Sequence, residues 1–226
     1  MNTLDTLRDL DELIRLRSIL YHPFYVAWQR GELTRRQLAT YAKLYWPHVG
    51  AFPGYLESVI EQTDDPLVRK DLEENLNDER SRPSSHSELW LDFAEELGLS
   101  REDVCGVPLH AAAKKMVKAF TRLAHSGVAN GITALYAYEV QQPEVSRQKQ
   151  EGLRCHYGVQ SRKALAYFEV HSEADIAHSR GERESLARCL DAGASHSGVI
   201  GAATDALDAY WGLLDGICVE AGIAST

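Results

Sequence analysis

The sequence has few cysteines, no strand signal and no long apolar run, and each shortage argues against a class of protein. None of its four cysteines forms a Cys-x-x-Cys pair, so we expect free thiols rather than a zinc ribbon or a redox motif. There is no sustained alternation of apolar and polar residues, which argues against a β fold. No apolar stretch approaches the roughly 18 residues of a membrane span.

Basic residues are fewer than acidic residues. The chain has 33 Asp and Glu against 24 Lys and Arg, a formal net charge of -9, and no basic run interleaved with aromatics. Nucleic acid is therefore not an expected partner. The first residues, MNTLDTLRDLDELIRL, lack the basic and apolar regions of a signal peptide, so a cytoplasmic location is expected.

The pattern that is present is helical. Apolar residues recur at spacings of three and four along the last segment, at Val199, Ala203, Leu207, Tyr210, Leu214 and Ile217. With 226 residues and 44% hydrophobic content, the chain can bury one sizeable core. We predict an all-α fold, a compact bundle of about seven to eight helices forming one domain over residues 1–226.

Helix boundaries follow from capping residues and breakers. A first helix is expected near residues 3–19, and Thr34 and Asp65-Pro66 are typical helix starts. We expect prolines 47 and 53 to interrupt the apolar segment 34–62, and Val107-Pro108 to begin a helix. We expect Gly98 to end a helix and Ser100-x-x-Asp103 to open the next one. Gly127 and Gly131 should bracket a turn, and Gly158 and Gly193 should mark later helix boundaries. Pro143 is expected late in a helix.

The segment 168–182, FEVHSEADIAHSRGE, carries a candidate ligand stripe. His171, Asp175 and His178 stand at positions i, i+4 and i+7, which lie on nearly one face of a continuous helix. Imidazole and carboxylate groups on one face suit an iron, manganese or zinc ion. A solvated polar face is the alternative interpretation.

Two further segments add ligands. In segment 76–90, Pro83 cannot donate to the carbonyl of Glu79, so Glu79 should end one helix and His86 should open the next. In segment 131–144, Glu139 follows an apolar helical run, where an unpaired acid is costly. Glu144 competes with it but lies past Pro143 and is more plausibly solvated.

Together these segments supply three carboxylates and three imidazoles. Such a set is typical of dimetal sites in helical bundles and favours iron or manganese over a structural zinc, which needs fewer ligands and prefers cysteine.

These motifs resemble the TENA/THI-4/PqqC group of heme-oxygenase-like proteins, and most of all its branch named for the chlamydial protein associating with death domains. The resemblance covers nearly the whole chain. It is most specific at HPFY (22–25), E-x6-H (79–86), YE (138–139) and H-x3-D-x2-H (171–178).

The resemblance implies a heme-oxygenase-like fold, frequent homodimers and two metal ions, either two irons or one iron and one manganese, that react with dioxygen and need an external electron donor. It assigns one ion to Glu79, His86 and His171, and the other to Glu139, Asp175 and His178. This branch forms p-aminobenzoate for folate synthesis and consumes itself. A tyrosine of its own chain, matched by Tyr25, supplies the ring, and a lysine, matched by Lys149, is implicated as the amine donor.

The proposed catalytic residues, Tyr25, Lys149 and Tyr138, also fit the chemistry. A phenol beside oxygen-reactive metals is an accessible electron donor, and Tyr138 and Tyr167 are further aromatics near the predicted site. A nucleophilic Lys149 requires a pKa lowered by a desolvated or cationic setting.

Other functions remain open from the sequence. The pyrroloquinoline quinone branch would make the protein a cofactor-free, multi-turnover oxidase of a small molecule, although the full ligand set argues against it. A thiamine-degrading relative would need a nucleophilic cysteine, and none of the four can be matched to that role. A protein-interaction module and a ferritin-like iron store are the alternatives of other classes.

Overall fold

The computed structural model describes residues 2–81, 84–106 and 108–223. Within these ranges no strand occurs, which agrees with the predicted all-α fold. The helices are α1 (Thr3–Leu16), the 3-10 turn η1 (Ile19–Tyr21), α2 (Pro23–Gln29), α3 (Arg35–Ile60), α4 (Pro66–Glu79), α5 (His86–Glu96), α6 (Arg101–Cys105), α7 (Ala111–His125), α8 (Val128–Glu139), α9 (Gln142–Cys155), α10 (Arg162–His171), α11 (Ala174–Asp191) and α12 (His196–Ala221).

The described helices outnumber the predicted seven to eight because several end at short junctions. α8 and α9 are separated only by Val140 and Gln141, and α10 and α11 only by Ser172 and Glu173. Pro143 follows the first of these junctions, whereas the second has no glycine or proline at the break and leaves little trace in the sequence.

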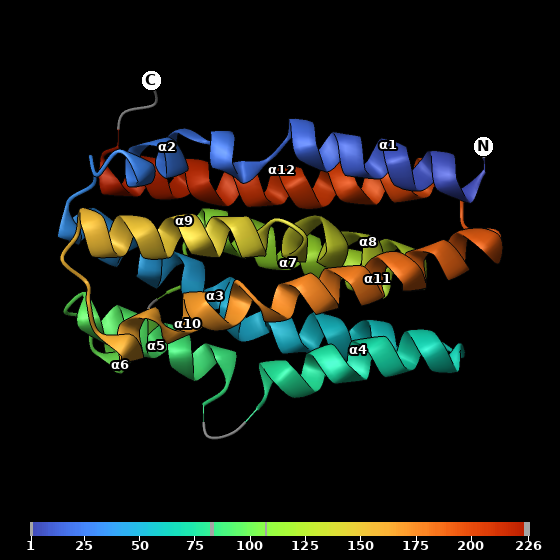
Figure 1. Cartoon of the computed structure of the whole chain (residues 1–226), viewed down its shortest axis with the longest axis horizontal. Coiled ribbons are helices and arrows are strands. Elements are labelled where there is room, and N and C mark those ends of the chain that lie inside the picture. Colours follow the sequence, from blue (N-terminus) through green and yellow to red (C-terminus); the bar gives the residue numbers. More distant parts are fainter. Residues whose placement is uncertain (1, 82–83, 107, 224–226) are drawn as a thin grey trace.

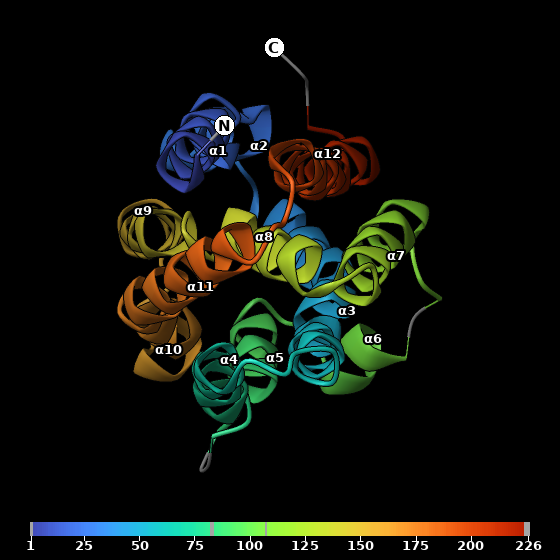
Figure 2. The same cartoon turned by 90° about the vertical axis from the view of Figure 1, so that its right-hand side faces the viewer.

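The helices surround α8, which lies near the middle of the bundle in Figure 2. Helix α12 packs along α1 on one side, and α4, α5 and α10 lie on the opposite side (Figure 1). Every residue from Gly131 to Glu139 in α8 is buried. A helix that is covered on all sides carries Glu139 into the interior instead of to the surface.

Gly131 lies inside α8, so the predicted turn between Gly127 and Gly131 is wrong. Only Gly127, with φ of +113°, marks the boundary before the helix. A Cβ at Gly131 would come within 2.4 Å of Val59 Cγ2 on α3. The glycine is therefore required for the close approach of α8 and α3.

Pro47 and Pro53 were expected to interrupt the apolar segment 34–62. Both lie inside one continuous helix, α3. Each proline removes one backbone donor, which costs helix stability. The helix is retained because its buried face, which includes Tyr41, Tyr45 and Phe52, packs throughout its length in the core. Tertiary packing has outweighed a local preference here.

Two other boundaries differ from prediction. Helix α7 begins at Ala111, beyond the predicted Val107-Pro108 start, and Val107 itself lies outside the described residues. Pro143 is in the first turn of α9 rather than late in a helix. Proline is tolerated in a first turn because the missing N–H has no partner there.

The remaining caps confirm the predictions. Thr34 forms a capping box with Gln37, and Asp65 caps α4 ahead of Pro66. Ser100 forms a capping box with Asp103, and Gly98 adopts a positive φ of 93° just past α5. The first helix ends at Leu16, somewhat earlier than expected.

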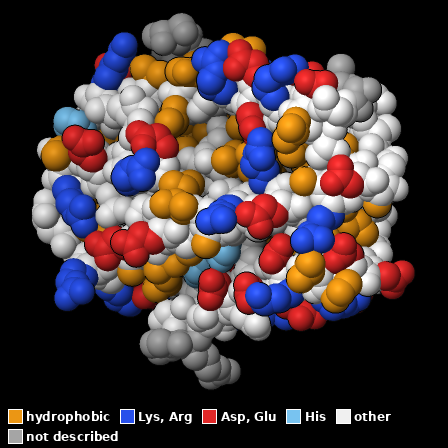
Figure 3. Space-filling view, turned by 45° about the vertical axis from the view of Figure 1, so that its right-hand side comes forward, with side chains coloured by type: hydrophobic (Ala, Val, Ile, Leu, Met, Phe, Trp, Pro, Cys, Tyr) orange, Lys and Arg blue, Asp and Glu red, His pale blue; other side chains and the backbone are white. Residues whose placement is uncertain are grey.

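The surface mixes charges of both signs, as the face in Figure 3 shows. None of the described helices is both long and apolar enough to cross a bilayer.

Candidate metal centre

The helix junction predicted around Pro83 brings Glu79 and His86 together. Glu79 is the last residue of α4 and His86 the first of α5. Both side chains are buried, and His86 Nδ1 lies 2.9 Å from Glu79 Oε1. Burial opposes a charge on His86, but the Glu79 carboxylate outweighs it and raises the pKa of the imidazole.

His171 completes this first group from the end of α10. Its Nδ1 lies 2.6 Å from the carbonyl oxygen of Tyr167, so Nδ1 carries the hydrogen and donates it. The lone pair of Nε2 is then free for a metal. Burial lowers the pKa of His171 well below its usual value, which keeps the ring neutral. The rings of His86 and His171 have centroids 4.4 Å apart.

The predicted stripe of His171, Asp175 and His178 does not lie on one continuous helix. Ser172 and Glu173 separate α10 from α11, so His171 ends one helix while Asp175 and His178 stand in the first turns of the next. The break aims His171 at the first group and the other two side chains at a second.

Glu139, Asp175 and His178 form the second group. Glu139 is the last residue of α8, and His178 Nδ1 lies 3.4 Å from its Oε1 and 3.3 Å from Asp175 Oδ1. The Nδ2 of Asn75 is 3.0 Å from both oxygens of Glu139 and fixes that carboxylate. Asn75 belongs to none of the sequence motifs described above and was not identified from the sequence.

Within each group, one potential ligand atom per residue lies within 4.8 Å of the others. This is the division into two sets of three that the family resemblance implies. The competing acid Glu144 is exposed and pairs with Arg147, as expected for a solvated residue. Metal binding by the six residues stays a prediction.

The electrostatics of the second group favour a cation. Burial raises the pKa of Asp175 to about 7, and Oδ2 of this carboxyl has no hydrogen-bond partner among the described residues. Burial disfavours the charged form of His178, but Asp175 and Glu139 outweigh it and raise the pKa of His178 to about 11. No Lys or Arg of the described chain forms an ion pair with any of the three candidate carboxylates. Metal ions would displace the protons and supply the missing positive charge, so the donor set fits the predicted metals.

Glu182 adds a fourth buried acid that sequence reasoning missed. It stands one turn after His178 on α11, and neither carboxyl oxygen has a well-formed hydrogen bond among the described residues. Burial and the neighbouring Glu139 raise the pKa of Glu182 well above its usual value. The i+4 spacing from His178 was the available signal.

A small cavity lies against both groups. Its volume is about 10 Å³, and its lining contains four of the candidate ligands together with aromatic and apolar side chains: Val49, Phe52, Glu79, Tyr138, Glu139, Tyr167, His171 and Asp175. Tyr138 and Tyr167 therefore lie beside the candidate metals, as predicted.

Tyr25 and Lys149 lie together in a second cluster and do not line this cavity. Lys149 Nζ lies 5.2 Å from the centroid of the Tyr25 ring and 2.7 Å from the phenol oxygen of Tyr41. Lys149 is only 2% exposed, and burial lowers the pKa of its amine to about 7. The desolvated setting that a nucleophilic lysine requires is therefore present. Tyr41 was not identified from the sequence.

Comparison with known proteins places the chain in a family. A family model described as iron-containing redox enzyme matches residues 39–211. The chain is 39% identical over 206 residues to a 4-aminobenzoate synthase of Chlamydia pneumoniae, with 91% of each chain covered. It is 27% identical over 156 residues to a pyrroloquinoline-quinone synthase of Xanthomonas campestris, covering 66% of this chain and 60% of that one.

The fold has solved counterparts. The crystal structure of a TenA homologue from Pseudomonas syringae matches with a TM-score of 0.83 at 17% sequence identity, covering 96% of this chain and 93% of that chain. This likeness confirms the predicted fold, and the family model and the chlamydial relative extend over most of the sequence. The chain therefore belongs to the heme-oxygenase-like family of iron-containing redox enzymes.

Proposed function

We propose that this protein is an oxygen-dependent oxidase that makes p-aminobenzoate from its own Tyr25, with Lys149 as the amine donor. Two iron ions, or one iron and one manganese, would be held by the six candidate ligands. The observation that carries the proposal is the buried Lys149 amine beside the Tyr25 ring, in a protein with two three-residue metal groups.

The metals, when bound and reduced by an external donor, would supply the activation of dioxygen, which side chains do not perform unaided. The protein residues prepare the site for them. The Tyr167 carbonyl fixes the tautomer of His171, and Asn75 holds both oxygens of Glu139. Such supporting hydrogen bonds set the orientation and basicity of metal ligands.

The surroundings of Lys149 favour a nucleophilic amine. With a pKa of about 7, a large fraction of the amine is neutral at physiological pH, and its hydrogen bond to Tyr41 orients it. The nitrogen is already held near the Tyr25 ring, which replaces a bimolecular encounter with an intramolecular one. The same burial keeps water from competing as a nucleophile.

Aromatic side chains connect the two clusters. Tyr167 packs on His171 with ring centroids 4.0 Å apart, and its ring lies 4.8 Å from that of Trp90. Trp90 in turn lies 5.6 Å from Tyr41, whose phenol oxygen is 3.4 Å from that of Tyr25. This row of contacts supports removal of electrons from Tyr25 without direct contact with a metal.

The size of the inner cavity supports an internal substrate over an added one. A cavity of about 10 Å³ has room for roughly one water molecule. A multi-turnover oxidase of the pyrroloquinoline quinone type must place an organic substrate against its reactive centre. This inner cavity has no such space, although a cleft of about 930 Å³ reaches Glu79 from outside.

The test uses protein in which tyrosine carries a ring label. Metal-free protein is loaded with ferrous iron, with and without manganese, reduced and exposed to air with no added substrate. We expect labelled p-aminobenzoate in at most stoichiometric amount, and none from Tyr25→Phe protein that retains its metal. Unlabelled product, or normal product from Tyr25→Phe, would refute the proposal.

A further inference from the structure

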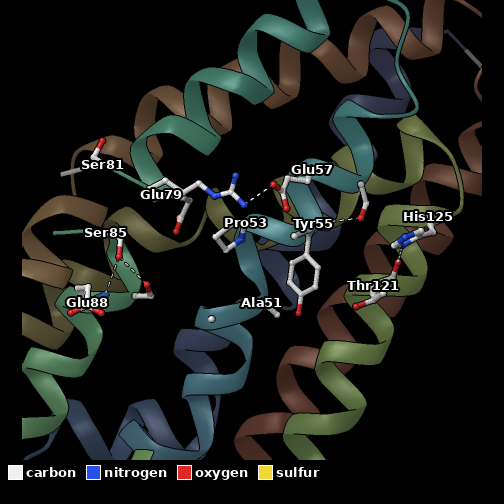
Figure 4. Close-up of a pocket in the computed structure, with 15 residues that line it drawn as sticks. Ala51, Pro53, Tyr55, Glu57, Glu79, Ser81, Ser85, Glu88, Thr121 and His125 are labelled. Atoms are coloured by element: carbon white, nitrogen blue, oxygen red, sulfur yellow. Dashed lines mark hydrogen bonds and ion pairs between the residues drawn. The ribbon is translucent and has the colours of Figure 1, made fainter. Parts of the chain in front are cut away.

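A solvent-filled cleft lies beside the candidate metal centre. It has a volume of about 930 Å³ and opens between α3, α7, the end of α4 and the start of α5 (Figure 4). Its lining is rich in hydroxyl and charged side chains, among them Glu57, Ser58, Glu79, Arg80, Ser85 and Glu88.

Glu79 is the side chain that joins this cleft to the metal centre. It lines the open cleft and also the small inner cavity between the two ligand groups. None of the six candidate ligands is more than 9% exposed, so all six are largely shielded from bulk solvent. At Glu79 the cleft brings solvent up to a ligand carboxylate.

The chemistry of the cleft suits a hydrated cation. The serine hydroxyls can accept hydrogen bonds from the water molecules around an ion, and the carboxylates of Glu57 and Glu88 are paired with Arg80 and Arg101. Arg80 is held by Glu57 at 2.6 Å, so the cleft's basic side chain is neutralised.

Tyr55 also lines the cleft and is 2% exposed. Its hydroxyl oxygen is buried without a hydrogen-bond partner among the described residues, and Figure 4 shows the ring directed away from Glu57 and Glu79. This hydroxyl is therefore not a contact for an ion in the cleft.

We propose that this cleft is the entrance through which hydrated divalent cations reach the metal centre, with Glu79 as the residue that receives them. The proposal rests on the proposed metal-binding function. The competing route runs past Asp78, an exposed acid whose Oδ2 lies 3.0 Å from His178 Nε2.

A plug in the cleft tests the proposal. Gly54 lines the cleft within α3, and a Cβ built there meets nothing within 4 Å, so Gly54→Phe places a phenyl ring in the cleft and narrows it without a backbone clash. Gly212 in α12 is the matched control, because its Cβ position is equally open and it does not line the cleft. Ser58→Phe, from the same wall of the cleft, repeats the test if Gly54→Phe does not fold.

The measurement is the rate at which metal-free protein takes up Co²⁺ or Mn²⁺ and releases it to a chelator. We expect uptake and release by Gly54→Phe to be slower by about tenfold or more, which corresponds to ~1.4 kcal/mol in the barrier, with unchanged final stoichiometry. Gly212→Phe should match the unmodified protein.

The outcomes separate the two proposals. If the unmodified protein binds no metal, the proposed function fails. If it binds metal and the plugged protein loads at the same rate, only the entrance is refuted. Slow loading in Asp78→Asn together with normal loading in Gly54→Phe would assign the entrance to the His178 side.

Discussion

The amine nitrogen of Lys149 lies 2.7 Å from the phenol oxygen of Tyr41, in surroundings where the lysine is 2% exposed. Four aromatic rings, those of Tyr25, Tyr41, Tyr45 and Phe168, have centroids within 5.5 Å of the same nitrogen. No carboxylate forms an ion pair with it among the described residues. A lysine buried in this way reduces stability, which supports the chemical role proposed for it.

Replacing Lys149 with methionine should therefore separate function from stability. We expect Lys149→Met to form no p-aminobenzoate, to bind the same amount of metal, and to unfold at a free energy equal to or above that of the unmodified protein. Lys118→Met, at an exposed position of α7, is the control and should change neither property. A strongly destabilised Lys149→Met protein with normal product would contradict this account.

The pKa of Lys149 also predicts how stability depends on pH. Burial lowers its pKa to about 7 in the folded protein, from about 10.4 in the unfolded chain. Between these values the unfolded state binds more protons, so this group makes the free energy of unfolding rise with pH, by at most about 1.4 kcal/mol per unit. Below pH 7 both states carry the proton and the contribution is flat.

Denaturant unfolding from pH 6 to 10 checks this directly. The difference in unfolding free energy between unmodified protein and Lys149→Met should shift in favour of the lysine as pH rises. Parallel curves would show that the pKa of Lys149 is not lowered in the folded protein.

Asp175 offers a test of the second metal group. Asp175→Asn keeps the shape of the side chain but removes its charge, so we expect metal content to fall from about two ions per chain to about one. Asp191→Asn makes the same change at an exposed position of α11 and should leave the metal content unchanged. Elemental analysis measures both, and full occupancy in Asp175→Asn would remove this residue from the ligand set.

The buried carboxyl group of Glu182 leads to a prediction about the stability of the metal-free protein. Its carboxyl group is buried without a well-formed hydrogen bond among the described residues and lies near Glu139. Replacement by glutamine supplies an N–H donor for Glu139, so Glu182→Gln should raise the free energy of unfolding by about 1 kcal/mol.

The exposed Glu184 serves as the matched position for that experiment. Glu184→Gln should change the free energy of unfolding by no more than about 0.5 kcal/mol. Destabilisation by Glu182→Gln, with Glu184→Gln neutral, would mean that the acid makes a favourable interaction within the centre.

The sequence predicted which candidate side chains come together better than it predicted the helices that carry them. The junction between Glu79 and His86 followed from Pro83, because a missing backbone donor is a local property of the chain. The prolines of α3 predicted a break that core packing prevents, and the break after His171 left no local signal. Local rules fail where tertiary contacts decide.

The same limit applies to the side chains that were missed. Asn75 and Tyr41 act through contacts with Glu139 and Lys149, which lie 64 and 108 residues away in the sequence. Nothing in the neighbourhood of either residue records such a contact. The homodimer, the cytoplasmic location and the single domain over residues 1–226 stay predictions.

The most direct test of the central claim is crystallography of protein loaded with iron or with iron and manganese, using anomalous scattering to locate the ions. The account predicts two peaks. One should lie among Glu79, His86 and His171, and the other among Glu139, Asp175 and His178. Full loading in solution with no anomalous peak at either group would contradict it.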